Sequence, residues 1–274
     1  MTTAAVPAPR LGATLNRLRW AVLDALTLTE RNLTAWLHNP MFLLFTLMQP
    51  VMFTLLFRYV LGGAIPVHVP GGYVDYLLPG VIGQAVAFGS SGTAIALGRE
   101  TQRGVLDRFR SMPMVQSAVL AGRMAADTVR MFLMIVCMIG IGYAVGFRFH
   151  NGLGPAIAMV ALATVFGLAL SCVSAFLGLS IKDVESIQAF GLIWVFPFTF
   201  VSSAFVPIQT MPGWLQAFAY NQPVTIVVDT LRYLALGPAA GSSLEPHLWQ
   251  SFAWLGGMVT VFGTLAVRGY LRRN

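Results

Sequence analysis

The sequence predicts an all-α integral membrane protein with six transmembrane helices. Charged residues make up 10% of the 274-residue chain and hydrophobic residues 57%, whereas about 25% of the residues of soluble domains are charged. The apolar residues gather in runs of about 20, the length that a helix needs to cross a hydrocarbon core roughly 30 Å thick. A transmembrane barrel is not expected, because the short segments of alternating polarity that form one are missing. The six runs are 41–61, 76–98, 119–147, 153–180, 187–207 and 249–267.

The residues before the first run predict an amphipathic helix over 15–40 that lies on the cytoplasmic face of the membrane. Apolar positions recur there at helical spacing, and Trp20 and Trp36 suit the membrane interface. A helix that only caps the bundle would show the same pattern. Residues 1–14 are expected to be disordered, and residues 41–274 to form one six-span domain.

The distribution of cations predicts that both termini lie in the cytoplasm. Most of the 17 Lys and Arg fall before the first run, between the second and third, after the fourth, or at the end of the chain. The segment 62–75 contains none, so the positive-inside rule places it outside. We therefore expect a multi-pass protein of the bacterial cytoplasmic membrane. The net charge of +7 is explained by this topology and by anionic lipid, so nucleic acid is not an expected partner.

The segment Gly98–Pro113, GRETQRGVLDRFRSMP, places four arginines and two carboxylates between two apolar runs. Such a charged segment must lie in water. As a short helix that ends at Pro113, it would offer a mixed-charge surface to a complementary soluble protein. A solvated loop whose arginines only set the topology would explain the charges, but not Gly104 and Pro113. The residues of the expected surface are Glu100, Arg103, Gly104, Asp107, Arg108 and Arg110.

Small residues four apart predict close packing of the helices in the third and fourth runs. The pairs are Gly142 with Gly146, Gly167 with Ser171, and Ser174 with Gly178. Small side chains at this spacing let two helix backbones approach each other in a membrane.

The segment 207–248 is too polar and too rich in proline for a seventh span, yet 214–236 is more apolar than a solvated loop. It predicts a re-entrant outer helical hairpin that is buried against protein, because lipid cannot satisfy broken backbone. Asp229 and Arg232 are three residues apart and are expected to form an ion pair on one helical face.

The sequence lacks the residues that proton-coupled transport, metal binding or ATP binding would need. The central parts of the six runs contain no Asp, Glu or His, so a proton-coupled relay has no residue to use. The four histidines, His38, His68, His150 and His247, are far apart in the chain, and no G-x-x-x-x-G-K-[ST] loop is present. We therefore predict no catalytic residue and no metal site. Cys137 and Cys172 are expected to be apolar fillers, and the energy for any transport to come from a separate cytosolic partner.

Five sequence blocks, in this order, carry a resemblance to a known family. They are HNPMFLLFTLMQPVMFTLLF, YVDYLLPG, GRETQRGVLDRFRSMPM followed by LAGRMAADTVR, LGLSIKDVESIQ, and FVSSAFVPIQTMPGWLQAFAYNQPVTIVVDTLR. Over about residues 33–270 the chain resembles the type-2 ABC exporter permeases, and among them the daunorubicin-resistance permease group. It departs from them at Ala204, where relatives commonly have glycine after the serine.

The resemblance implies that two permease subunits, this chain with a second copy or a paralogue, pair with two cytosolic ABC ATPase subunits. ATP and magnesium would bind to the ATPase, and this chain would bind no cofactor. The implied coupling residues are Glu100, Arg103, Gly104, Asp107, Arg108 and Pro113. The implied substrate pathway lies between the second and fifth spans of facing subunits, with Gln84, Phe88, Ser91, Phe196, Phe198, Phe200 and Ser203 as its candidate residues, although each of these could equally be a packing residue.

The expected function is that of an export permease subunit, not an enzyme, that expels a hydrophobic or amphipathic compound of drug or antibiotic type. An alternative within the family is a permease for an envelope lipid or polysaccharide. Alternatives from other classes are an ion-coupled multidrug antiporter and a membrane scaffold or immunity protein without transport.

Overall fold

The computed structural model describes residues 11–62, 69–110, 116–181, 183–240 and 244–272. Within these residues the secondary structure is helical, without a strand. The elements are α1 (Leu11–Leu37), α2 (Pro40–Leu56), η1 (Phe57–Leu61), α3 (Tyr73–Gln102), α4 (Val105–Arg110), α5 (Gln116–Val145), α6 (Leu153–Ser180), α7 (Val184–Phe200), η2 (Ile208–Thr210), α8 (Gly213–Asn221), α9 (Pro223–Leu236), η3 (Gly237–Ala240) and α10 (Leu244–Arg272).

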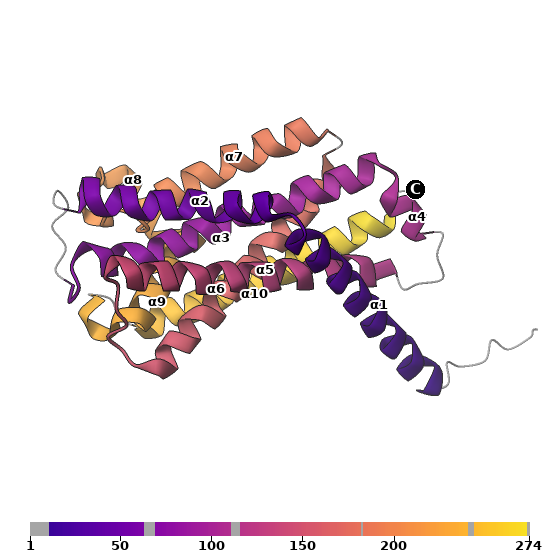
Figure 1. Ribbon diagram of the computed structural model, residues 1–274, viewed down its shortest axis with the longest axis horizontal. Helices are drawn as coiled ribbons and strands as arrows, with labels where there is room; N and C mark the ends of the chain where they lie inside the picture. The colour runs from indigo at the N-terminus through magenta and orange to yellow at the C-terminus, as the bar shows by residue number, and fades with distance from the viewer. Residues whose placement is uncertain (1–10, 63–68, 111–115, 182, 241–243, 273–274) are drawn as a thin grey trace, which may run out of the picture.

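Each of the six predicted apolar runs is a helix of one bundle (Figure 1). Four of these helices, α3, α5, α6 and α10, are long and apolar enough to cross a membrane. The other two, α2 and α7, are shorter apolar helices. The all-helical membrane fold is thus confirmed, with a hairpin of α8 and α9 at one end of the bundle, the α9 end, and the short α4 at the other, the α4 end.

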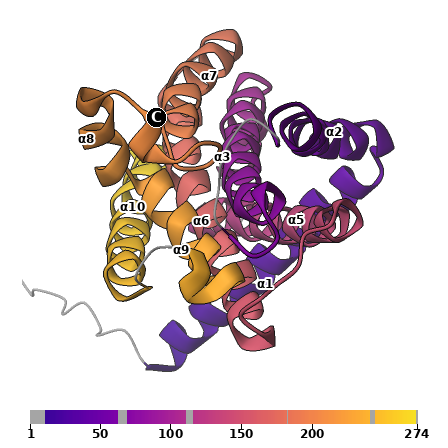
Figure 2. The same cartoon turned by 90° about the vertical axis from the view of Figure 1, so that its left-hand side faces the viewer.

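Helix α3 lies at the centre of the bundle, with α2 on one side and α7 on another (Figure 2). In its apolar stretch 67% of the residues are buried, against 17% in that of α10. Its side chains form the main hydrophobic core together with those of α5, α6 and α9. Helices α2, α4, α5, α6, α7 and α9 all contact α3.

Small residues bring α6 against α3, as their spacing predicted. A Cβ atom at Gly178 would lie 2.5 Å from the carbonyl oxygen of Ala94, and Ser174 Oγ donates to Ser90 Oγ over 3.3 Å. On α5, the prediction of close packing is confirmed at Gly142 and wrong at Gly146. Gly142 packs against Leu78, but Gly146 follows the last residue of the helix with a φ of +108°, so it ends α5 and does not pack.

Helix α1 begins at Leu11, four residues before the expected start, and residues 1–10 lie outside the described residues. It crosses the bundle at an angle near the α4 end (Figure 1) and rests on α5, where Thr29 Oγ1 donates to the carbonyl oxygen of Gly122 over 3.1 Å. Trp20 and Leu26 on α1 remain about 60% exposed. One side of α1 thus packs on protein while another presents apolar side chains.

The predicted helical hairpin is present as α8 and α9, which meet at Gln222. Pro223 starts α9, where its missing N–H costs no helical hydrogen bond. Gln222 Nε2 donates to the carbonyl oxygen of Val201, which ties the turn to the end of α7. Most residues of α9 are buried against α3, α6 and α10, so the expectation of burial against protein is confirmed for α9. It is wrong for α8, in which Trp214 is 77% exposed and Phe218 and Tyr220 are also exposed.

We expect the change Gly178→Ala to destabilise the bundle, because the added Cβ meets the backbone of α3, which cannot move aside. Overpacking of this kind lowers the free energy of unfolding by about 1–3 kcal/mol. Thermal unfolding in detergent measures the effect. Gly256→Ala on α10 is the control, because nothing lies within 4 Å of its Cβ position; equal melting of the two variants would contradict the prediction.

Candidate functional site

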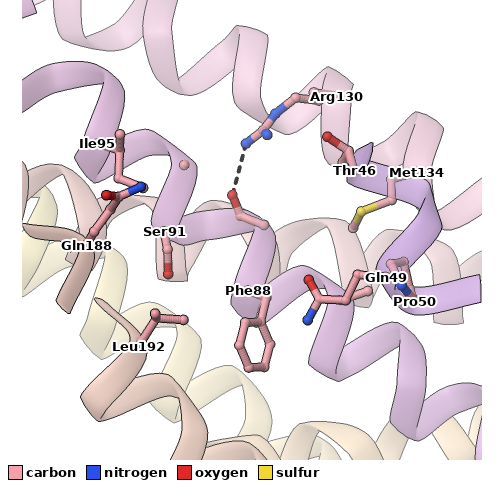
Figure 3. Close-up of a pocket in the computed structure, with 13 residues that line it drawn as sticks. Thr46, Gln49, Pro50, Phe88, Ser91, Ile95, Arg130, Met134, Gln188 and Leu192 are labelled. Carbon is pink, nitrogen blue, oxygen red and sulfur yellow. Dashed lines mark hydrogen bonds between the residues drawn. The ribbon is translucent and has the colours of Figure 1, made fainter. Parts of the chain in front are cut away.

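A groove of about 460 Å³ lies between α2 and α7, with α3 as its floor and α5 at one side (Figure 3). Its walls combine apolar side chains with a few polar groups, which is the composition of a site for small amphipathic molecules. The lining residues are Thr46, Gln49, Pro50, Ala85, Phe88, Gly89, Ser91, Gly92, Ile95, Arg130, Met134, Gln188 and Leu192.

Aromatic rings continue from this groove toward the α9 end. Phe88 meets Phe196 edge-on with ring centroids 5.0 Å apart, and Phe196 stacks on Phe200 at 5.4 Å. Phe200 then contacts Phe205 at 5.3 Å, and Phe205 stacks on Phe57 at 4.6 Å. Phe196 and Phe200 remain more than 40% exposed, so this part of the row offers an aromatic surface, whereas Phe205 is buried at 4% exposure.

The structure brings four of the seven predicted pathway residues to this face. Phe88 and Ser91 line the groove, and Phe196 and Phe200 belong to the aromatic row. Phe198 does not join them, because its ring packs against Trp194 and Phe218.

The other two pathway residues, Gln84 and Ser203, are buried, 2% and 3% exposed. Nε2 of Gln84 finds no hydrogen-bond partner within the described residues, whereas Ser203 Oγ donates to Asp229 Oδ1 over 2.7 Å. Ala204, the departure from the related sequences, has no positive φ, so the fold there does not require glycine.

The predicted ion pair of Asp229 and Arg232 is confirmed, with 2.6 Å between Oδ1 and Nη1. Arg232 also donates from Nε to the carbonyl oxygen of Tyr76 and from Nη2 to that of Ser203, and its guanidinium lies 3.8 Å from the centre of the Tyr76 ring. One buried side chain thus joins α9, the start of α3 and the segment after α7. We call this arrangement the Arg232 lock.

A second charge cluster was not predicted as a site. Asp127 on α5 is 7% exposed and accepts a hydrogen bond from Thr93 Oγ1 of α3 over 2.6 Å. Its carboxylate also lies 3.3 Å from Nη2 of Arg130 and 3.6 Å from Nε of Arg123. Arg123 in turn pairs with Glu100, at the end of α3, over 3.2 Å. These five residues are the α3–α5 charge cluster.

The cluster corrects one expectation about the spans. Asp127 lies within the membrane-length helix that covers Ser117–Val145, so that helix does contain a buried carboxylate. Two guanidinium groups and a hydroxyl already hold this carboxylate, which is the arrangement of a paired charge. The signal was visible in the sequence, because Arg123, Asp127 and Arg130 follow each other at spacings of four and three residues, which put them on one helix face.

The charged segment after α3 contains a turn and a short helix. α3 ends at Gln102, exposed Arg103 follows it, and Gly104 adopts a φ of +66°, a conformation that favours glycine. α4 then carries Asp107 and exposed Arg108. Of the predicted coupling residues, Glu100 is the one engaged in the charge cluster, and Pro113 lies outside the described residues.

No group of three or more His, Cys, Asp or Glu that could hold a metal ion occurs among the described residues. The lining of the groove supplies one aromatic ring, amide and hydroxyl groups and one guanidinium.

Comparison with known proteins agrees with this architecture. Residues 24–236 match the ABC-2 type transporter family. The chain is 32% identical, over 93% of its length and 88% of the relative's, to the "Daunorubicin resistance ABC transporter permease protein DrrB1" of Streptomyces coeruleorubidus. It is 28% identical, over 97% of its length and 94% of the relative's, to the "Probable doxorubicin resistance ABC transporter permease protein DrrC" of Mycobacterium tuberculosis.

We expect Arg232→Ala to destabilise the α9 end by about 3–5 kcal/mol, because it removes the buried cation that pairs with partly buried Asp229 and donates to the carbonyl oxygens of Tyr76 and Ser203. Arg232→Lys should lie between this variant and the wild type, since an ammonium group lacks the fork that reaches three acceptors. The midpoint of thermal unfolding in detergent measures both. Arg148→Ala is the control, because exposed Arg148 bonds only to nearby carbonyls through its side chain; a similar loss there would count against the lock.

Proposed function

Because the chain belongs to the ABC-2 type transporter family, we propose that it is the permease subunit of an exporter that moves hydrophobic or amphipathic, drug-like compounds out across the cytoplasmic membrane. A separate ABC ATPase supplies the energy and binds ATP and magnesium. The observation that carries this proposal is the aromatic groove over α3, which has the size and lining of a site for such compounds.

In this proposal the α4 end and both termini lie in the cytoplasm, since most cations of the chain map to that end. α1 lies on the inner leaflet with its exposed apolar side chains in lipid. The α8–α9 hairpin lies at the outer end, partly within the membrane. All six apolar helices span the bilayer, the shorter α2 and α7 through continuation into η1 and the segment after Phe200.

We propose that the groove faces a second permease subunit, so that the two copies enclose the pathway. The aromatic row supports this arrangement. It leaves Leu192, Phe196 and Phe200 between 41% and 49% exposed on one face, where a second subunit would cover them. Separation of the two faces would then open a passage lined by aromatic rings.

The ATPase is proposed to bind at Arg103, Gly104 and α4. Movement of α4 would act first on α3, which ends two residues before it. The ion pair of Glu100 with Arg123 would carry the same movement to α5, whose Arg130 lines the groove. The docking segment and the groove are thus connected through the α3–α5 charge cluster.

One prediction tests whether an ABC ATPase binds to the permease. Purification from native membranes in mild detergent should recover a soluble subunit with a phosphate-binding loop and ATPase activity. The triple change Arg103→Ala, Asp107→Ala, Arg108→Ala should release that subunit, because it removes the charges on the proposed docking surface.

Arg19→Ala with Glu30→Ala, two exposed charges of α1, is the matched control and should retain the partner. A permease that purifies alone from its native membrane, or a triple variant with unchanged recovery of the ATPase, would contradict the proposal.

Another prediction tests whether the exported compound binds in the groove. Phe88→Ala with Phe196→Ala should lower ATP-dependent export of doxorubicin by roughly tenfold, because two aromatic contacts of about 0.5–1.5 kcal/mol each are lost. Export is measured from the fluorescence of the compound retained in cells, at matched amounts of permease.

Phe198→Ala is the control, since its ring packs on Trp194 and Phe218 on another side of α7. Equal loss of export in the two variants would indicate that packing, and not the groove, is affected.

A further inference from the structure

We propose that Arg130 is the group within the groove that recognises an oxygen acceptor, such as a carboxylate, phosphate or carbonyl, on an amphipathic molecule. The inference rests on the proposed function of the groove as a substrate site. It names the polar chemistry that the site selects, which the aromatic row does not determine.

Arg130 reaches the groove from α5, and Figure 3 shows its guanidinium directed toward α3 above Ser91 and Phe88. The residue is 9% exposed, so it is shielded from bulk water. A charged group at this depth of a membrane-length helix is unfavourable unless it has partners, and such groups mark functional sites.

The partners that Arg130 has leave part of its hydrogen-bonding capacity unused. Among the described residues both of its polar contacts use Nη2, which donates to the carbonyl oxygen of Gly89 over 3.1 Å and lies 3.3 Å from Asp127 Oδ1. Nη1 makes no such contact there and lies 3.5 Å from the Cβ position of Gly92 in the groove lining, whereas Nε is also unpartnered there but buried beyond the reach of a ligand. A guanidinium carries five N–H donors in a planar fork, so it can still bind an acceptor.

The carboxylate of Asp127 beside Arg130 also contacts two other side chains. Asp127 also accepts from Thr93 and lies 3.6 Å from Nε of Arg123, so it does not belong to Arg130 alone. Since Arg123 is also paired with Glu100, the cluster holds two guanidinium groups and two carboxylates, and what Arg130 offers to the groove is unused N–H donors. An N–H donor without an acceptor favours a carboxylate, phosphate or carbonyl oxygen over a head group that can only donate, such as an isolated ammonium.

The rest of the groove fits a molecule with one polar end and an apolar body. Ser91, Gln49 and Gln188 supply neutral hydrogen-bonding groups, and Phe88, Met134 and Leu192 supply the apolar wall. With the acceptor at Arg130, a ring system would lie against Phe88 at the start of the aromatic row. In this arrangement Arg130 recognises the polar end of the molecule, and the apolar wall binds its ring system.

Three fluorescent probes with the same apolar body test the inference: pyrenebutyrate, pyrenebutanol and pyrenebutylamine. Binding to the full chain in nanodiscs of zwitterionic lipid is measured at neutral pH, without ATP. We expect the carboxylate probe to bind at least about tenfold more tightly than the ammonium probe, as for a hydrogen bond to a charged group.

Arg130→Gln should abolish this preference while the affinity for pyrenebutanol changes little. Arg123→Gln is the matched control, because Arg123 contacts the same Asp127 but does not line the groove. It should keep the preference. If Arg130→Gln does not fold, Arg130→Gln with Asp127→Asn, which removes both members of the pair, takes its place. The inference is overturned if the preference survives the loss of Arg130, or if Arg123→Gln reduces it equally.

The acceptor could come from an exported compound or from the phosphate of a membrane lipid, and a change of bilayer distinguishes the two. If phosphatidylglycerol nanodiscs suppress binding of pyrenebutyrate to the wild type more than to Arg130→Gln, a lipid phosphate occupies the site. If they do not, the site is open to the compound. Because binding needs no ATPase, absence of the preference in the wild type together with intact export refutes only this inference. Absence of ATP-dependent export by the wild type together with an intact preference refutes only the proposed function.

Discussion

The burial of α3 is the constraint on which the other features of the structure depend. Gly80 lies against the backbone of Ala204, and Gly178 brings α6 against Ala94, so α3 is held by backbone contacts at both ends. Contacts of this kind leave little freedom to slide, because backbone cannot move aside as a flexible side chain does. The groove takes its floor from this helix, the Arg232 lock holds its start, and the docking segment continues from its end.

Several polar groups inside the bundle connect α3 to a neighbour. At the α9 end, buried Asp75 accepts from the backbone N–H of Arg148 over 3.2 Å and lies 3.3 Å from Nδ1 of His150. At the α4 end, Thr93 meets Asp127 of α5. Because an unpaired charge in this environment is unfavourable, each pair specifies which helices are adjacent and in which register. The contacts of Asp127 also connect α3 to the helix whose Arg130 lines the groove.

The side of α3 that faces α2 and α7 is less buried than its other sides. Toward α6 and α9 its side chains are fully buried, whereas toward α2 and α7 it carries half-buried Phe88 and Ser91 and the groove. A helix that is packed on three sides and accessible on the fourth can present a binding surface without losing its position.

Local patterns in the sequence determined the elements of this protein and one of its ion pairs. The apolar runs became helices because each satisfies its own backbone hydrogen bonds, and Asp229 pairs with Arg232 because three residues place them on one turn. The order of the five sequence blocks was sufficient to identify the family. Only the tertiary structure decided which side of each helix meets which neighbour. Phe196 and Phe198 are the same residue type in the same apolar run, so the sequence does not distinguish them. The rotation of α7 puts Phe196 in the aromatic row and Phe198 against α8. In the same way Thr93 and Asp127, 34 residues apart, meet only because α3 and α5 pack side by side, and that contact places Arg130 in the wall of the groove.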